Sequence, residues 1–108
     1  ELCERLAIGN NAINLSGKFS LEELIALISI SDLFVANSTG PLHIAAALGK
    51  PVVGFYPPVP ALSATRWGPY TNKKALFIPD MPCKDKCTKD ECIKLNCMNS
   101  IETQNVLE

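Results

Sequence analysis

Five residues in one short segment have the types and spacing needed to bind an anion: Ser38, Thr39, Gly40, Pro41 and His43. They follow an apolar run at 33–36 and open an alanine-rich stretch that ends before Gly49. At the N-terminus of a helix, free backbone N–H groups and the positive end of the helix dipole can hold a phosphate. The segment therefore predicts a strand, a phosphate-binding turn and a helix, with His43 as a further hydrogen-bond donor.

The same residues also have a purely structural interpretation, which the sequence leaves open. Thr39 is a common helix-capping residue, and Gly40 permits a tight turn. His43 is equally able to pack on the helix with its ring bonded to the backbone. It is the only histidine of the chain, so the sequence excludes a metal site built from several histidines.

The composition indicates one domain with a hydrophobic core. The chain has 108 residues, of which 47% are hydrophobic and 19% are charged, and its formal net charge is −1. No broad basic surface is expected for nucleic acid or an anionic membrane. No apolar stretch reaches the roughly 18 residues of a transmembrane helix. Because Glu1 stands inside a helical pattern, we interpret 1–108 as a single partial domain cut from a longer protein.

Hydrophobic spacing and turn residues predict alternating helices and strands. The expected helices cover 1–7, 21–30, 41–48 and a terminal segment opened by a capping box at 99–102, and the expected strands cover 12–15, 33–36, 52–56 and 75–78. Ser20 and Glu23 form another capping box, Gly49 marks a helix end, and the alanines 45–47 should pack on the sheet. Unbroken apolar runs in the central strands are typical of a parallel sheet covered on both faces. The expected fold class is α/β: a Rossmann-like, short and mostly parallel sheet with helices on both faces.

Residues 57–72 form a proline-rich loop that carries the large side chains of Arg66, Trp67 and Tyr70. Long ordered loops near a site are commonly functional, so this loop is expected either to cover a ligand or to face a second domain. The alternative is that Trp67 and Tyr70 anchor the loop by packing on the sheet edge. We favour this alternative for Trp67.

Four cysteines follow the last expected strand, without the C-x2-C pairs of common zinc sites: Cys83, Cys87, Cys92 and Cys97. Free buried thiols, a metal site and a disulfide all remain open. We favour free thiols, because thiols stay reduced in the cytosol. Cys3 stands apart and is expected to be a buried residue of the first helix.

Four features stand in a fixed order along the chain: the segment 20–24, the run 38–51, the segment 66–70 and the spaced cysteines that end in 97–101. The run 38–51 is similar to the signature Ser/Thr-Gly-x-x-His-x-Ala-Ala-Ala-x-Gly. Together these features resemble glycosyltransferase family 9, the bacterial lipopolysaccharide heptosyltransferases. One motif alone is weak, but four in order are fairly specific, and the resemblance extends from residue 12 to residue 106.

The resemblance implies the C-terminal, donor-binding half of a GT-B enzyme, in which two Rossmann-like domains face a cleft. The family transfers heptose, with inversion, from an ADP-sugar to the lipopolysaccharide core. The expected partners are a nucleotide-diphosphate sugar, ADP-linked, and a glycolipid acceptor held by an N-terminal domain that is absent here; no cofactor or metal is expected. The general base, an aspartate, lies in that domain, so this chain should hold no catalytic residue and be inactive alone. The implied location is cytoplasmic or peripheral at the inner membrane face.

The resemblance also places Lys18, Phe19 and Ser20 near the base and ribose of the donor, in a loop that borders the nucleotide cleft of a doubly wound domain. The alternative for Lys18 is a solvated lysine, and for Phe19 a hydrophobic staple onto Leu24. One residue departs from the family pattern: aspartate often precedes Thr-Gly, where this chain has the uncharged Ser38. The sugar of the donor is therefore left open.

Three other functions remain open on the sequence. One is a non-catalytic nucleotide-binding module of the Rossmann type, and another is a cysteine-rich metal-binding module on an α/β scaffold. The third is a GT-B epimerase, which has a similar nucleotide pocket.

Overall fold

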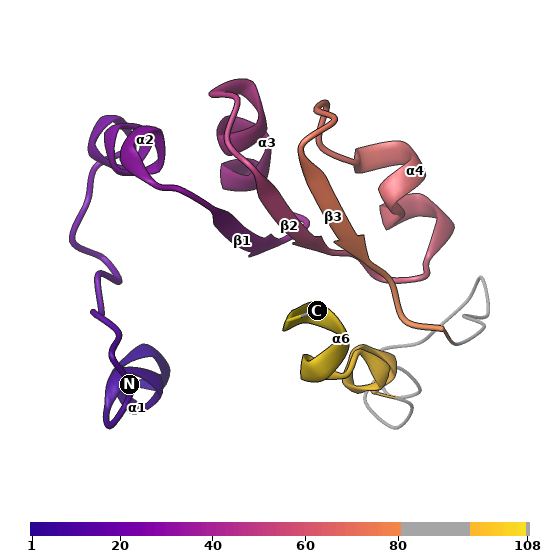
Figure 1. Cartoon of the computed structure of the whole chain (residues 1–108), viewed down its shortest axis with the longest axis horizontal. Coiled ribbons are helices and arrows are strands. Elements are labelled where there is room, and N and C mark those ends of the chain that lie inside the picture. Colours follow the sequence, from indigo (N-terminus) through magenta and orange to yellow (C-terminus); the bar gives the residue numbers. More distant parts are fainter. Residues whose placement is uncertain (81–95, 108) are drawn as a thin grey trace.

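Three parallel strands form the centre of the computed structural model, which describes residues 1–80 and 96–107. They lie side by side in chain order (Figure 1): β1 (Phe34–Asn37), β2 (Val52–Phe55) and β3 (Lys74–Phe77). The register places Ala36 of β1 beside Gly54 of β2, and Gly54 beside Leu76 of β3. The expected α/β class is confirmed, and the strands begin and end within one residue of the expected bounds.

One face of the sheet carries the hydrophobic core. Three helices lie on this side (Figure 1): α2 (Leu21–Ile30), α3 (Gly40–Ala47) and the short α4 (Ala64–Trp67). The buried residues of the helices, the sheet and the chain after β2 form one cluster: Ile28, Leu42, Ala45, Val52 and Tyr56. Removing this apolar surface from water is what favours docking of the helices. The first turn of α3 is thereby held at a defined place on the sheet.

The opposite face is covered in part. The 3-10 helix η2 (Cys97–Ser100) and α6 (Thr103–Leu107) lie on this side (Figure 1). They are near Phe55, whose ring stacks on that of Phe77 with 5.8 Å between centroids. Val35 faces the same way, since side chains alternate along parallel strands in register, and it is 54% exposed. Helices therefore lie on both faces, as expected, and within the described residues the cover over β1 is incomplete.

Two helix ends predicted from the sequence are confirmed. At the start of α2, the Ser20 N–H donates to Glu23 Oε2 (2.8 Å) and the Glu23 N–H donates to Ser20 Oγ (3.3 Å), which completes the capping box. At the end of α3, Gly49 has a φ of +72°, and the Lys50 N–H donates to the Ala45 carbonyl oxygen (3.0 Å). Glycine suits this left-handed conformation, which closes the helix and turns the chain toward β2.

Small residues let α3 approach the sheet closely. Ala45 and Ala46 are buried, as expected, but Ala47 is exposed because successive helix positions turn away from the sheet. On the sheet side, a Cβ atom on Gly54 would lie 3.1 Å from Leu42 Cδ2. The absence of a side chain at Gly54 thus sets how near the first turn of α3 lies to β2.

The expected strand at 12–15 is not formed. The segment joins no ladder of the described sheet, and Ile13 is 82% exposed. Local turns engage the backbone instead, as where the Ser16 N–H donates to Asn14 Oδ1 (3.0 Å). Such local hydrogen bonds compete with a sheet ladder. The segment and its neighbours line a cavity with α1 (Leu2–Ala7) and α2.

The prediction of a capping box at 99–102 is also wrong. Asn99 lies inside η2, with its N–H bonded to the Asn96 carbonyl oxygen (3.0 Å), whereas an N-cap residue has a non-helical backbone. The terminal helix begins only at Thr103.

The cysteines fall in two groups. Cys83, Cys87 and Cys92 lie outside the described residues, while Cys97 is a free, partly buried thiol. Cys3 is exposed, against expectation, because α1 buries none of its residues. Among the helices of the described ranges, none has both the length and the hydropathy needed to cross a membrane.

Candidate functional site

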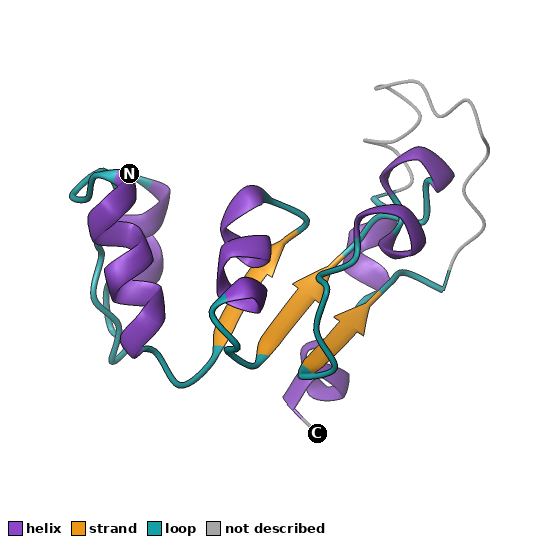
Figure 2. Ribbon diagram, turned by 90° about the horizontal axis from the view of Figure 1, so that it is seen from above, coloured by secondary structure: helices purple, strands orange, loops and turns teal. Residues whose placement is uncertain are grey.

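The turn from β1 into α3 lies at the carboxyl end of the parallel sheet (Figure 2). The Ser38 N–H donates to the carbonyl oxygen of Phe55 (3.1 Å), which ties the turn to the end of β2. Ligands of open α/β sheets bind at this edge, where loops follow the strands. The local fold therefore presents the segment 38–40 where a ligand is expected.

The Thr39 side chain does not cap α3. Thr39 is the N-cap residue, with an extended backbone at φ −139°, but no side-chain capping bond forms. Its Oγ1 instead donates to the carbonyl oxygen of Asn37 (3.2 Å), so it faces back toward β1. The purely structural interpretation of Thr39 as a side-chain cap is therefore wrong.

The first N–H groups at the start of α3 are available to a ligand. In the part of the chain that the structure describes, neither the Thr39 N–H nor the Gly40 N–H has an acceptor, and Pro41 has no N–H. The first bonded donor is Leu42, whose N–H reaches the Thr39 carbonyl oxygen (3.1 Å). Two adjacent free N–H groups at the positive end of a helix form a favourable place for an anion.

A cavity of about 390 Å³ opens in front of these N–H groups. It is lined by residues of the turn, of α3 and of the loop before β3: Ser38, Thr39, Gly40, His43, Leu62 and Trp67. Four of the five residues predicted from this segment thus share one cavity. The fifth, Pro41, is half-buried in the first turn of α3 and does not line it.

His43 faces this cavity from the first turn of α3 and is half-buried. Among the described residues, no hydrogen bond engages its imidazole ring, so the alternative of a ring bonded to backbone is not what the structure shows. A histidine ring always carries at least one N–H donor. His43 is therefore free to donate to a ligand that occupies the cavity.

The proline-rich loop supplies the remaining wall. It contains the 3-10 helix η1 (Pro60–Leu62) and α4, and it turns back so that Leu62 and Trp67 reach the cavity. The indole of Trp67 donates through Nε1 to the Ala61 carbonyl oxygen (3.0 Å), and Arg66 lies 5.4 Å from the ring centroid. The Trp67 indole thus joins two parts of the loop and, at 48% exposed, presents part of its ring to the site.

A second cavity of about 400 Å³ adjoins the first, because Ser38 and Leu62 line both. Its other lining residues are apolar or uncharged: Asn37, Phe55, Pro57 and Met98. Of the described residues around the two cavities, none is acidic. A bound anion therefore meets no nearby carboxylate to repel it.

Comparison with known proteins decides the family. The sequence profile of glycosyltransferase family 9 (heptosyltransferase) matches residues 1–97. This chain belongs to glycosyltransferase family 9. The resemblance seen in the motifs is confirmed, and the parallel α/β fold agrees with it.

Relatives of this family 9 chain are named as heptosyltransferases. It is 39% identical over 61 residues to lipopolysaccharide heptosyltransferase 1 of Campylobacter coli, across 56% of this chain and 18% of the relative. It is 29% identical over 99 residues to lipooligosaccharide heptosyltransferase 2 of Campylobacter jejuni, across 88% of this chain and 30% of the relative. It is 32% identical over 81 residues to lipopolysaccharide heptosyltransferase 3 of Escherichia coli, across 71% of this chain and 23% of the relative. The chain spans less than a third of the length of these relatives. No solved structure matches it significantly.

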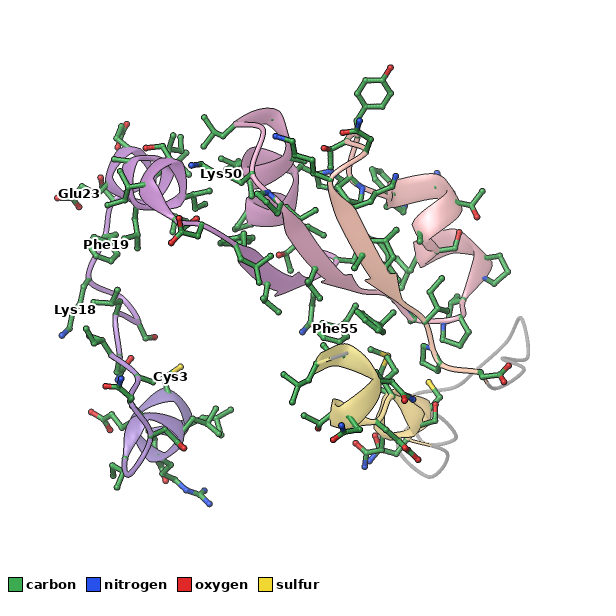
Figure 3. All side chains as sticks on the ribbon, viewed as in Figure 1. Cys3, Lys18, Phe19, Glu23, Lys50 and Phe55 are labelled. Carbon is green, nitrogen blue, oxygen red and sulfur yellow. The ribbon has the colours of Figure 1, made fainter. Side chains whose placement is uncertain are left out.

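The structure of the family 9 chain does not bring Lys18, Phe19 or Ser20 to the cavity at α3. Figure 3 shows Lys18 and Phe19 on the connection between α1 and α2, well apart from Phe55. Phe19 lines a different cavity of about 410 Å³, which Leu24 also lines, and the Ser20 hydroxyl is engaged in the capping box. Their placement near the base and ribose stays a prediction.

Two features of the loop were not predicted. Leu62 carries no sequence signal of its own, because only the folded course of the proline-rich loop brings it to the cavity. Tyr70 is fully exposed and does not anchor the loop, whereas its neighbour Pro69 is buried. The anchoring alternative is therefore wrong for Tyr70, and for Trp67 packing on the sheet edge stays a prediction, while its indole bonds within the loop and lines the cavity.

Proposed function

We propose that this chain is the donor-binding part of a glycosyltransferase, and that the cavity at α3 holds the diphosphate of a nucleotide-diphosphate sugar. The observation that carries the proposal is the pair of free N–H groups at Thr39 and Gly40, which open into a cavity that His43 also faces. Membership of glycosyltransferase family 9 supports the same conclusion.

The arrangement suits the departing group of a glycosyl transfer. Negative charge builds on the diphosphate as its bond to the sugar breaks, and fixed N–H donors aimed at that charge stabilise the transition state. Thr39 and Gly40 supply two such donors, and His43 supplies a third from the same helix turn. In this scheme the positive potential comes from the helix N-terminus and from side chains, without a metal.

For the whole protein, we propose inverting transfer of a sugar from an ADP-linked donor to a lipopolysaccharide core or related glycan. The names of the relatives favour heptose as the sugar. In this proposal, a further N-terminal domain supplies the general base and holds the glycolipid acceptor. The whole protein would work in the cytoplasm or at the inner face of the membrane. Because Ser38 is uncharged where the family often has aspartate, the proposal also includes donors whose sugar is not heptose.

Trp67 offers a direct test of donor binding, because it is the only tryptophan of the chain and it lines the cavity. We expect ADP to change the Trp67 fluorescence with saturation, and AMP, which lacks the second phosphate, to bind more weakly. Amide NMR shifts should concentrate at Thr39, Gly40 and His43. Parallel titrations with UDP and GDP identify the preferred base.

Two results contradict the proposal. One is the lack of any response at millimolar nucleotide diphosphate. The other is a set of amide shifts confined to residues that line neither of the two adjoining cavities.

A further inference from the structure

Tyr56 follows β2 and is fully buried in the core beneath the site. Its hydroxyl donates a hydrogen bond of 2.8 Å to the carbonyl oxygen of Trp67. Trp67 is the last residue of α4, so no further helical turn supplies a donor for this carbonyl group. The Tyr56 hydroxyl thereby supplies the donor that this carbonyl group at the end of α4 would otherwise lack, and α4 carries the cavity wall formed by Trp67.

The loop has few other ties to the sheet. Most hydrogen bonds of its residues are internal, as where the Trp67 N–H reaches the Ser63 carbonyl oxygen (2.9 Å). A second tie comes from β3, where Lys74 Nζ donates to the Pro69 carbonyl oxygen (3.0 Å). Tyr56 therefore makes the one hydrogen bond of the described residues that joins the core directly to the Trp67 backbone.

Tyr56 also contacts the opposite wall of the cavity. The Ser38 side chain lies near the Tyr56 hydroxyl and partly offsets the rise in its pKa that burial causes. The Tyr56 proton is directed at the Trp67 carbonyl oxygen. Tyr56 thus lies near Ser38 and is bonded to Trp67, and both of these residues line the same cavity.

We propose that Tyr56 is a positioning residue for the donor site: its hydroxyl holds Trp67 at a fixed separation from Ser38 and the first turn of α3. This role rests on the proposed function, because it assumes that the cavity between the two walls holds the donor. Pre-forming the cavity removes the cost of ordering the Trp67 wall when the donor binds. Tyr56 itself contacts no ligand.

Tyr56→Phe tests this role, because it removes the hydroxyl and keeps the buried ring. We expect the variant to fold and to bind ADP about three- to tenfold more weakly, the effect of one net hydrogen bond. Without ligand, acrylamide should quench Trp67 more strongly in Tyr56→Phe than in the wild type. Tyr70→Phe is the matched control, since Tyr70 is fully exposed and lines no described cavity, and it should change neither quantity.

A double variant separates positioning from general stability. In the Trp67→Ala background the wall is gone, so adding Tyr56→Phe should lower ADP affinity no further when binding is followed by calorimetry. An equal loss of affinity in both backgrounds would show that Tyr56 acts through the stability of the core, and would overturn the proposal.

The outcomes also separate the two proposals. Tyr56→Phe with wild-type affinity and wild-type quenching of Trp67, beside a wild-type chain that binds ADP, overturns the role of Tyr56 alone. A wild-type chain that binds no nucleotide diphosphate overturns the proposed function and, with it, the role of Tyr56 in donor binding.

Discussion

Leu42 of α3 lies directly against Gly54 of β2: a Cβ atom added to Gly54 would come 3.1 Å from Leu42 Cδ2. The same atom would lie 3.0 Å from Leu76 Cδ2 and 3.1 Å from Tyr56 Cε2. All three distances are shorter than ordinary van der Waals contact, so the three side chains would have to shift to admit the methyl group. Gly54→Ala should therefore lower the free energy of unfolding by about 1–3 kcal/mol, the usual cost of overpacking a core.

Urea unfolding followed by circular dichroism measures this change. Because the added methyl group pushes on the first turn of α3, ADP affinity should fall as well. A Gly54→Ala variant as stable as the wild type would contradict the close contact of α3 with the sheet.

Gly40→Ala is the matched variant, because a Cβ atom on Gly40 meets nothing within 4 Å. We expect the free energy of unfolding to change by no more than about 0.5 kcal/mol, as for most surface substitutions. The methyl group enters the open space in front of the free N–H groups, so nucleotide diphosphate affinity should fall by at least about fivefold through a weakened charge-assisted hydrogen bond. Titration calorimetry on the folded variant checks this, and an unchanged affinity would argue against an anion at this turn.

His43→Ala should weaken binding of ADP more than binding of adenosine. The ring faces the cavity and has no hydrogen bond within the described residues, so its removal costs the fold little. Loss of one hydrogen bond to a charged phosphate predicts about a tenfold or greater drop in affinity. Competition against Trp67 fluorescence measures both ligands. An equal drop for ADP and adenosine would place His43 at the nucleoside and not at the diphosphate.

Local signals in the sequence predicted the elements that position the site. The two helix ends depend on local interactions that need no tertiary partner: the capping box of Ser20 with Glu23, and the left-handed Gly49 at the end of α3. Both formed as expected. The central strands were predictable because they are continuous apolar runs bounded by turns. The strand predicted at 12–15 is absent from the described sheet. A strand forms only when it pairs with another strand, and the local sequence does not show whether such a partner is present.

The residues of the candidate site also differ in whether local sequence predicts their position. Ser38, Thr39, Gly40 and His43 are close in sequence, so the turn alone brings them to one cavity. Leu62 and Trp67 reach that cavity only through the folded course of a long loop, in which the Trp67 carbonyl oxygen accepts a hydrogen bond from the distant Tyr56. Lys18 and Phe19 were placed near the nucleoside by family resemblance. No local pattern in the sequence tests that placement, which stays a prediction.

Ser20→Ala should lower the free energy of unfolding by about 1 kcal/mol, because it removes the side-chain acceptor of the capping box at the start of α2. Ser20→Asp keeps an acceptor at the same place and should retain most of the wild-type stability. Urea unfolding of the two variants compares them directly. Equal losses in both would show that the hydroxyl does not act as a cap in solution.

The last prediction concerns pH. Burial raises the pKa of Tyr56 above its ordinary value of 10.0, and the nearby Ser38 side chain lowers it in part. The folded state thus keeps this proton at a pH where the unfolded state has released it. The contribution of Tyr56 to stability is therefore fully present below pH 10.0 and is lost as the pH rises from there through the higher pKa of the folded state.

Tyr56→Phe has no proton to lose at this position, so its free energy of unfolding should fall less above pH 10.0 than that of the wild type. Once ionised, Tyr56 can no longer donate to the Trp67 carbonyl oxygen. Acrylamide quenching of Trp67 in the wild type should therefore rise in the same pH range, toward the level of Tyr56→Phe, whose quenching should stay flat. Parallel curves for the two proteins would contradict both the burial of the hydroxyl and its hold on the cavity wall.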